Sequence, residues 1–450
     1  MKKNLLDKSI RPLNKFIHYE NSGGIALFLA VIIALFWANS PFRDSYHNLW
    51  QTNFSIGFDN HHLSYSLRYW VNDGLMAMFF FVIGLELKRE IIAGELSTLK
   101  KAMLPMAAAL GGILFPALIY IVINYNEPTV VGWGIPMATD IVFALSLMTL
   151  AGKKVPLAAK VFLVAVATVD DLCAVLVIAF FYSSDLSIFS LLSGLSLLSL
   201  LVGANLIGVR NTIFYAIIGI GGVWLAFMLS GVHATIAGVL VAFAIPARTR
   251  VNESLYSRCI SYLIYKFKNY NPINGPLITQ HHHRIIEKIK VVSREAQTPL
   301  QKIEGALHPI VTFVVIPIFA LANAGVGIGQ NFLTDLINPV SMGIFFGLTI
   351  GKLVGVLSFT WIIVKSKITT LPKNINWMHI AGIACLSGVG FTMSIFITTL
   401  AFYDPQVIDQ AKYGILLASL FSGISGVVML KKAVLLQENK PKNQALILQT

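Results

Sequence analysis

The sequence predicts an all-α integral membrane protein with about twelve transmembrane helices. Of its 450 residues, 56% are hydrophobic and only 12% are charged, and the mean hydropathy is +0.72. This composition is far from that of a soluble globular protein. Apolar windows long enough to cross about 30 Å of hydrocarbon recur along nearly the whole chain. Membrane lipid is therefore the expected partner.

The predicted helices form one transmembrane domain over residues 22–432. It lies between an N-terminal segment (1–21) and a C-terminal tail (433–450), and it contains a polar insertion at 248–302. The weakest boundary, between the seventh and eighth spans, rests on a short turn at Leu229–Gly231. The predicted spans lie near 22–39, 70–92, 102–123, 132–150, 157–182, 187–208, 212–229, 231–247, 307–328, 341–364, 378–402 and 412–431.

The distribution of basic residues predicts the orientation of these spans. The loops on one side carry most of the Lys and Arg, whereas the loops on the other side carry only Arg43 and Arg68, with Lys412 at a margin. By the positive-inside rule, both termini lie in the cytoplasm. The net charge of +13 then reflects topology and anionic lipid and does not indicate nucleic acid.

Two predicted spans contain residues that interrupt a helix at membrane depth. The fourth span begins with GWGIPMATDIVFAL at 132–145, and the eleventh contains LSGVGFTMSIF at 386–396. Irregular backbone is tolerated in a membrane only where it is buried in protein or lines a cavity, so both breaks indicate one polar interior. Spans three to five and ten to twelve run in opposite directions, each set with a broken helix in its middle. They predict an inverted repeat, and in transporters built from such repeats the substrate binds at the interface between the two repeats. This general rule is based in part on proteins that the chain resembles.

Adjacent aspartates, Asp170 and Asp171, lie in the fifth span. A carboxylate near the bilayer centre costs at least a few kcal/mol, so two together need a compensating function. A structural ion pair would need only one acid. Neighbouring side chains on a helix point about 100° apart, so one aspartate can face a water-filled cavity while the other faces a protein partner. The pair therefore predicts a binding site.

Three more polar residues are candidates for this site. Lys352 in the tenth span needs an acid or the C-terminal carbonyls of a broken helix, and Asp170 is the natural partner. Asp140 follows Thr139 at the first break. Three acids and one base at membrane depth are hard to explain by packing. Thr139 can either face a cation or bond to its own helix.

Polar residues nearer the membrane surfaces have simpler interpretations. Glu86 and Arg89 close the second span, where a solvated helix end with intrahelical pairs is expected. His233 starts the eighth span among small residues, which favours a packed neutral histidine over a proton carrier. The three cysteines have no metal or disulfide spacing.

Two surface segments complete the pattern. The insertion contains a basic helical stretch that starts with His281, His282 and His283; three consecutive histidines make a poor metal site alone, so a solvated helix against anionic lipid is expected. The loop near 41–69 has the alternating pattern of an outer hairpin and offers a homodimer contact.

Eight specific motifs extend over nearly the whole chain. They are NDGLMAMFFFVIGLELKRE at 72–90, GWGIPMATDIVFAL at 132–145, VDDL at 169–172, SGVHATIAGV at 230–239, LHP at 307–309, FALANAGV at 319–326, GKLVG at 351–355 and GVGFTMSIF at 388–396. On these motifs the chain resembles the NhaA family of bacterial sodium/proton antiporters. The resemblance implies twelve spans in the cell inner membrane, with broken helices four and eleven crossing.

The resemblance also implies residue roles. Asp171 would be the principal sodium ligand and Asp170 its partner, paired with Lys352, while Thr139 lines the site and Asp140 compensates half-helix dipoles. The residues matching the cytoplasmic pH-responsive cluster are Glu86, Arg89, Glu304 and His308, with His233 affecting pH dependence. Two departures concern the pH set point: Gly305 stands where the family often has histidine, and the insertion is tens of residues longer than usual.

The expected function is therefore electrogenic, pH-regulated antiport of sodium, and of lithium, against protons, without enzymatic activity or a cofactor. Deprotonated Asp170 and Asp171 can replace the hydration shell of a small hard cation, and protonation destroys that site. Alternating exposure of the site then couples the two fluxes. One alternative is a cation channel, which would need acids from several chains. A second is an intramembrane aspartyl protease, but the usual Gly-x-Gly-Asp setting is absent around VATVDDL.

Overall fold

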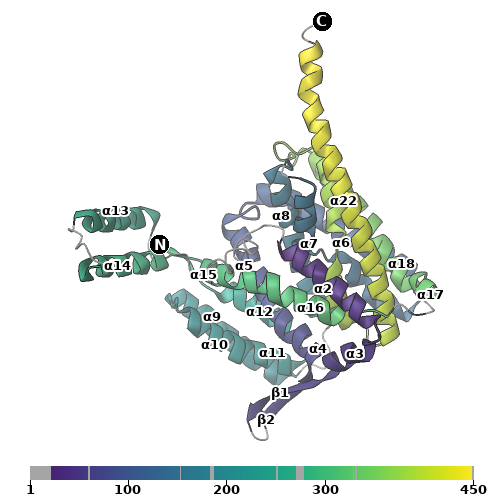
Figure 1. The fold of residues 1–450 in the computed structure, drawn as a ribbon, viewed down its shortest axis with the longest axis horizontal. Helices are drawn as coiled ribbons and strands as arrows, with labels where there is room; N and C mark the ends of the chain where they lie inside the picture. Colours follow the sequence, from purple (N-terminus) through teal and green to yellow (C-terminus); the bar gives the residue numbers. More distant parts are fainter. Residues whose placement is uncertain are drawn as a thin grey trace.

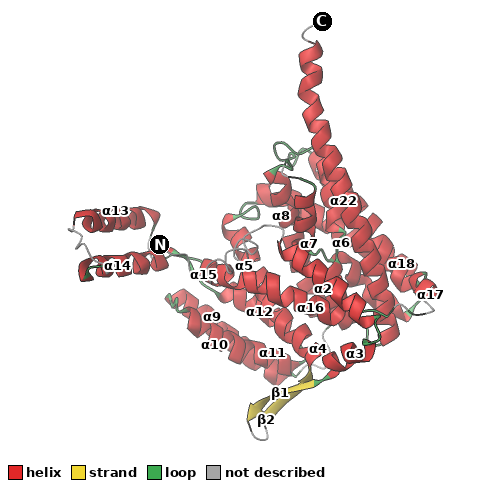
Figure 2. Cartoon of the chain, viewed as in Figure 1, coloured by secondary structure: helices red, strands yellow, loops and turns green. Residues whose placement is uncertain are grey.

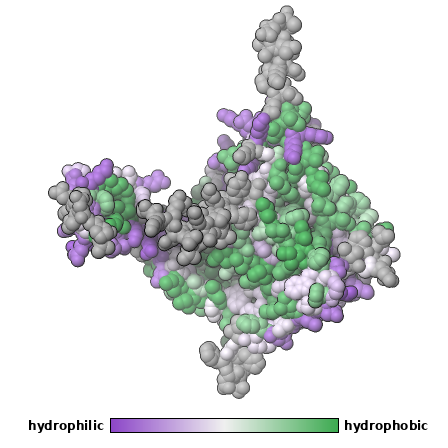
Figure 3. Space-filling view, in the orientation of Figure 1, coloured by the Kyte–Doolittle hydropathy of each residue, from purple (hydrophilic) through white to green (hydrophobic). Residues whose placement is uncertain are grey.

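The computed structural model describes residues 22–58, 61–152, 154–182, 187–249, 252–269, 278–327, 329 and 332–447. Within these residues, helices form a bundle with one two-stranded sheet (Figure 2). Seven described helices are long and apolar enough to cross a membrane, and the number rises to ten if each of three bent helix pairs counts as one span. Apolar side chains cover much of the bundle, with hydrophilic ones toward its edges (Figure 3). The predicted membrane fold is confirmed at this level.

The helices follow the predicted order along the chain (Figure 1). In the first half they are α2 (Ser22–Ala38), α3 (Arg43–Gln51), α4 (Leu67–Tyr69), α5 (Met76–Ala93), α6 (Leu99–Ile123), α7 (Ile141–Leu150), α8 (Leu157–Phe181), α9 (Ile188–Ile207), α10 (Thr212–Ile218), α11 (Leu225–Ser230) and α12 (Ala234–Ala244). In the second half they are α13 (Glu253–Asn269), α14 (Gln280–Ala296), α15 (Pro299–Ile310), α16 (Ile316–Asn323), α17 (Phe332–Leu336), α18 (Pro339–Phe346), α19 (Lys352–Lys365), α20 (Trp377–Ser387), α21 (Phe391–Ala401) and α22 (Pro405–Ile447).

Four π-helical turns join consecutive helices into longer units. They are Trp70–Leu75 between α4 and α5, Gly219–Trp224 between α10 and α11, Val311–Val315 between α15 and α16, and Gly347–Gly351 between α18 and α19. The seventh predicted span ends as expected, because Gly231 adopts a positive φ of 80° directly after α11.

One predicted boundary is wrong, and one predicted span lies inside a longer helix. The ninth predicted span was placed at 307–328, but α15 already begins at Pro299, so the insertion ends before the predicted residue 302. The reason is a capping box in which Thr298 and Gln301 satisfy the first backbone N–H groups of the helix. The last predicted span, 412–431, is part of a longer helix, α22.

Both predicted breaks are present, and they meet. The chain bends by 48° between a 3-10 helix at Pro128–Met137 and α7, and by 41° between α20 and α21. Asp140 N–H donates to the Val389 carbonyl across the two breaks at 2.7 Å. Two backbone interruptions thus satisfy part of each other's hydrogen bonding inside the bundle.

Close packing of α6 against α19 positions the lysine of the tenth predicted span. A Cβ on Gly355 would lie 2.0 Å from the Gly111 carbonyl oxygen, so only glycine permits this approach of the two backbones. Lys352 opens α19 beside the same crossing and is fully buried.

The predicted outer hairpin is also confirmed as a structure. β1 (Asn53–Phe58) pairs antiparallel with β2 (His61–Ser66), with Phe54 opposite Tyr65. It lies at the end of the bundle away from the C-terminal end of α22 (Figure 1).

The insertion forms a helical hairpin of α13 and α14 that stands beside the bundle (Figure 1). His282 points into this hairpin, where its Nε2 lies 3.1 Å from the Phe267 carbonyl and its ring packs edge-on against Phe267. His281 and His283 are exposed on the helix surface. No group of three potential metal ligands was found among the described residues.

Candidate functional site

The centre of the site is a fully buried ion pair. Lys352 Nζ lies 2.6 Å from Asp170 Oδ2, and both side chains are inaccessible to solvent. The sequence analysis paired these two residues, and the structure places them in contact. An ammonium and a carboxylate in this geometry neutralise each other at a depth where either alone would be costly.

Thr139 lies between the pair and the end of a broken helix. Its Oγ1 is 2.8 Å from Asp170 Oδ2 and 2.8 Å from the carbonyl of Ser387, the last residue of α20. Lys352 Nζ also donates to this hydroxyl at 3.1 Å. The single hydroxyl proton can serve Asp170 or Ser387 but not both at once. Thr139 therefore bonds to residues of other helices and not to its own helix, while the role of facing a cation stays a prediction.

Asp171 faces a different environment from Asp170. It lines a cavity of about 400 Å³ that also reaches Asp140 and, at its other end, Glu86 and His308. Asp171 Oδ1 and Asp170 Oδ1 are both buried and have no hydrogen-bond partner among the described residues. The expectation that one aspartate faces a cavity and the other a protein partner is thus confirmed.

Asp140 is held between the N-termini of two half-helices. Its Oδ1 accepts from the Phe143 N–H in the first turn of α7 at 3.0 Å. Its Oδ2 accepts from the Thr392 N–H at 3.2 Å and from the Thr392 hydroxyl at 2.6 Å, in the first turn of α21. The positive ends of both helix dipoles therefore meet on one carboxylate.

These contacts leave one buried acid without compensation. Asp170 is neutralised by Lys352, and Asp140 is stabilised by backbone and hydroxyl donors. Asp171 Oδ1 has no hydrogen-bond donor in the described chain, and the residue is only 1% exposed. Burial favours its neutral form or a bound cation, and these two states exclude each other.

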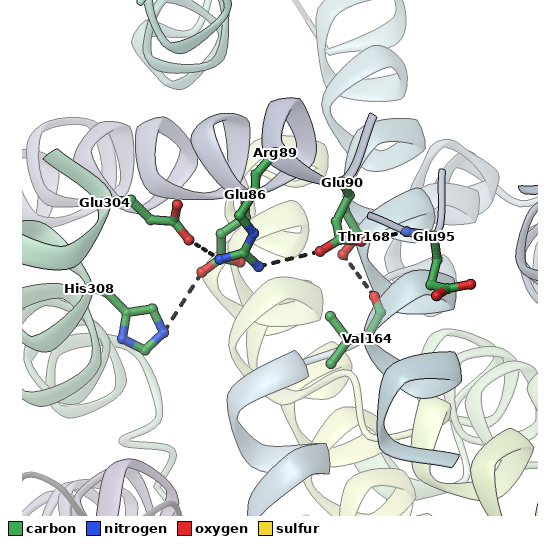
Figure 4. A network of polar contacts seen from close by, with 8 residues as sticks. All are labelled: Glu86, Arg89, Glu90, Glu95, Val164, Thr168, Glu304 and His308. Carbon is green, nitrogen blue, oxygen red and sulfur yellow. Dashed lines mark hydrogen bonds and ion pairs between the residues drawn. The ribbon is translucent and has the colours of Figure 1, made fainter. Parts of the chain in front are cut away.

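A second cluster of polar residues, Glu86, Arg89, Glu304 and His308, lines the same cavity, and its contacts are drawn in Figure 4. Arg89 contacts Glu304 on α15, and it also lies 3.4 Å from the neighbouring Glu90. His308 Nε2 lies 3.7 Å from Glu86 Oε1. The cluster thus joins α5 to α15, whereas the residues of α5 alone had suggested a solvated helix end with local pairs.

The remaining predicted residues lie apart from the buried pair. His233 Nε2 is 2.9 Å from the carbonyl of Tyr182, the residue directly after the C-terminal end of α8. The structure therefore shows the packed histidine that the sequence favours. Gly305 lies on α15 beside Glu304, and nothing would contact a Cβ added there.

Two residues with clear roles in this geometry were not assigned to the site from sequence. Thr392 was noted only as part of the second break, and its bond to Asp140 depends on the crossing. Lys88 appeared to be solvated, yet its Nζ donates to the carbonyls of Phe243 and Ile245 at the C-terminal end of α12. A lysine one residue before Arg89 gives no such signal without the fold.

Replacing Thr392 by Val tests the support of Asp140. The change keeps the shape but removes the hydroxyl donor, so we expect a loss of about 1–3 kcal/mol of stability, measured as a lower midpoint of thermal unfolding in detergent. Thr398→Val is the matched control, because Thr398 bonds only to Ser394 within its own helix. Equal midpoints for the two variants would contradict the role of Thr392.

Comparison with known proteins shows the family to which the chain belongs. Residues 14–430 match the family model described as Na+/H+ antiporter 1. The Na(+)/H(+) antiporter NhaA of Oleidesulfovibrio alaskensis is 46% identical over 438 residues, which cover 97% of each chain. Na(+)/H(+) antiporter NhaA 2 of Syntrophotalea carbinolica is 44% identical over 94% of this chain and 97% of its own. NhaA 1 of Saccharophagus degradans is 43% identical over 95% and 92%. The chain therefore belongs to the NhaA family of Na+/H+ antiporters.

Proposed function

We propose that this protein exports sodium, and also lithium, across the cell inner membrane in exchange for protons. The observation that carries the proposal is Asp171: a buried carboxylate whose Oδ1 has no hydrogen-bond partner in the described chain, next to Asp170 and lining a cavity. Carboxylate oxygens are suitable ligands for a small hard cation, and a proton on the same oxygens removes the site. The protein thus acts as a transporter, needs no cofactor, and is not an enzyme.

The proposed topology has twelve spans. Ten come from the long helices and the bent pairs, and α5 and α12 supply the other two. An even number places both termini on one side, and the basic loops place that side in the cytoplasm. The transmembrane domain is proposed to be 22–432, with cytoplasmic ends at 1–21 and 433–450.

The meeting of the two bent pairs supports an inverted repeat of spans three to five and ten to twelve. Each set carries one broken helix, and Asp140 receives donors from both half-helix N-termini. Rocking of one set against the rest would expose Asp171 to one membrane side at a time. Such alternation makes exchange obligatory, because the site cannot cross unloaded without leaving a bare charge in low dielectric.

The cation is proposed to bind between Asp171 and the unpartnered Oδ1 of Asp170, with Thr139 lining the site. Two titrating groups change in each cycle, either both aspartates or Asp171 and Lys352. More than one proton per cation makes the exchange electrogenic.

The cluster of Glu86, Arg89, Glu304 and His308 is proposed to set the pH response. These groups surround the mouth through which the cation reaches Asp171, so their charge controls the local potential. His233 is proposed to modify pH dependence from the outer end of the bundle. Nothing would contact a Cβ added at Gly305, and the cluster is proposed to work here without the histidine that the family often places there.

We further propose that the β1–β2 hairpin joins two copies of the chain. It is a two-stranded sheet, so each strand has an outer edge that is not paired within the described sheet. Pairing of hairpins between copies would satisfy these edges.

Sodium-dependent dequenching of a proton-gradient dye in everted vesicles tests the function. We expect a response to sodium and lithium across about pH 6–9, which spans titration of histidine and shifted carboxylates. A cation channel would carry current without proton counterflow. The relatives are named as antiporters and do not favour a channel. No response to any cation would refute antiport.

Asp171→Asn should abolish exchange while the protein stays folded and inserted. The amide keeps the shape of the side chain but cannot carry the charge for which sodium and proton compete. Asp170→Asn should be nearly as severe, since it removes the second ligand. The measurement is the dye response beside a thermal-unfolding control, and wild-type exchange in either variant would show that the site is misplaced.

Lys352→Ala should weaken exchange and lower the unfolding midpoint together. It leaves Asp170 uncompensated in a buried position, and breaking such a pair costs roughly 3–5 kcal/mol. Lys352→Arg should be milder because the charge remains. A Lys352→Ala variant with the unfolding midpoint and the exchange rate of the wild type would contradict the role of the ion pair.

Glu304→Gln should move the pH of half-maximal exchange to lower values without abolishing exchange. Removing a negative charge beside Arg89 and His308 makes bound protons in the cluster less favourable. The control is Glu287→Gln, because Glu287 is paired with Lys290 on the separate hairpin. A pH profile that moves equally in both variants would count against a specific cluster.

A further inference from the structure

The α13–α14 hairpin has no part in the proposed transport cycle. Tyr256 OH lies 3.1 Å from Ser293 Oγ, and Phe267 packs on His282, so the two helices are antiparallel. Among the described elements, neither helix packs extensively against anything but the other. The hairpin therefore stands beside the bundle and is not packed within it, as Figure 1 shows.

The helix periods define two sides of this hairpin. Contacts of Tyr256, Phe267 and His282, together with the lower exposure of positions 260, 263, 285, 289 and 292, indicate the side by which each helix faces the other. This contact stripe consists of 256, 260, 263 and 267 on α13 and of 282, 285, 289 and 292 on α14. The residues one position earlier form a second stripe on each helix, turned by about 100° from the first. Because α13 and α14 are antiparallel, the two stripes that lie one residue before the contact positions fall on the same side of the hairpin.

This side combines exposed apolar residues with basic ones. We call it the basic-apolar face, and its main residues are Leu255, Tyr262, Lys266, Arg284, Lys288 and Val291. The three uncharged side chains, Leu255, Tyr262 and Val291, are 47%, 56% and 53% exposed. Lys266 Nζ lies 4.9 Å from the centre of the Tyr262 ring. Glu295 ends the α14 stripe near the root of the hairpin.

The root of the hairpin is fixed at one end of the bundle. Only Gln297 and Thr298 separate α14 from α15, a reach of at most about 7 Å. Leu300 N–H donates to the Pro246 carbonyl at 3.2 Å, which ties the two chain segments of the root together. Lys88 further holds the carbonyl end of α12. These spans end at the proposed cytoplasmic surface, so the hairpin starts at the level of the lipid headgroups.

We propose that the basic-apolar face binds the anionic cytoplasmic surface of the membrane. Exposed Leu, Val and Tyr enter the headgroup region, and Lys and Arg contact lipid phosphates, as in other interfacial amphipathic helices. A second copy is a poor occupant because residues 253–296 carry seven Lys and Arg against three Glu, so two hairpins repel each other. The inference rests on the proposed function only for the side of the membrane.

A probe on Cys259 tests this assignment directly. Cys259 is exposed and lies on the same stripe, between Leu255 and Tyr262, and with Cys173 and Cys385 changed to Ala it is the only cysteine. The full chain is labelled there with an environment-sensitive fluorophore and placed as a single copy in nanodiscs of phosphatidylcholine, with or without phosphatidylglycerol. We expect a blue shift and quenching by spin-labelled lipid only with phosphatidylglycerol, reversed by potassium chloride.

The matched control places the probe on the opposite side. Ser261 lies one position after the contact stripe of α13, so the same label at Ser261→Cys, with Cys259→Ser, should remain in water in both lipids. Exposure of the Cys259 probe in both lipids would overturn the proposal. Shielding in both lipids would also overturn it, because another part of the protein would then cover the face.

Charge variants separate this face from a general attraction. The face variant K266Q/R284Q/K288Q should lower the ratio of docked to undocked hairpin by roughly 100-fold. The control K268Q/K290Q/R294Q removes the same charge from positions outside this face and should change this ratio far less. Equal effects would overturn the assigned face. Because these readouts do not measure exchange, failure of the lipid-binding proposal can be distinguished from failure of the antiport proposal.

Discussion

The structure depends on the neutralisation of buried charges by other protein groups in positions that solvent does not reach. Lys352 and Asp170 form an ion pair with no solvent access, and a single unpaired partner would cost several kcal/mol. The close crossing of α6 and α19 is what brings Lys352 to this depth. Glycine at positions 111 and 355 permits that crossing, so a packing feature of the backbone serves the electrostatics of the site.

The two broken helices solve the same problem for Asp140. A continuous helix has no unpaired N–H groups in its middle, whereas two half-helices provide free N-termini at membrane depth. Asp140 accepts from both, and the Thr392 hydroxyl adds a third donor. With Asp170 and Asp140 satisfied in this way, Asp171 remains as the buried carboxylate without such compensation. Under the proposed function, sodium and protons compete at this one carboxylate because the other two are already compensated.

Much of this arrangement could be predicted because its signals are local. Glycine, proline and polar residues mark both breaks, and the adjacent aspartates must point in different directions on any helix. The bond from Thr392 to Asp140 and the bonds from Lys88 to α12 could not be predicted, because they depend on how distant segments meet. The early start of α15 was missed for another reason: its capping box lies in a polar stretch that resembles a loop in composition.

The cluster of Glu86, Arg89, Glu304 and His308 is separate from the buried pair of Lys352 and Asp170. Glu304 and His308 lie on α15, whose first turn is tied to Pro246 and follows α14 after two residues. Arg89 and Glu86 lie on α5, next to Lys88, which holds the end of α12. Asp171 lines the same cavity as Glu86, Arg89, Glu304 and His308. Under the proposed function, a shift of these four residues would change access to Asp171 and the local potential there without moving the buried pair of Lys352 and Asp170.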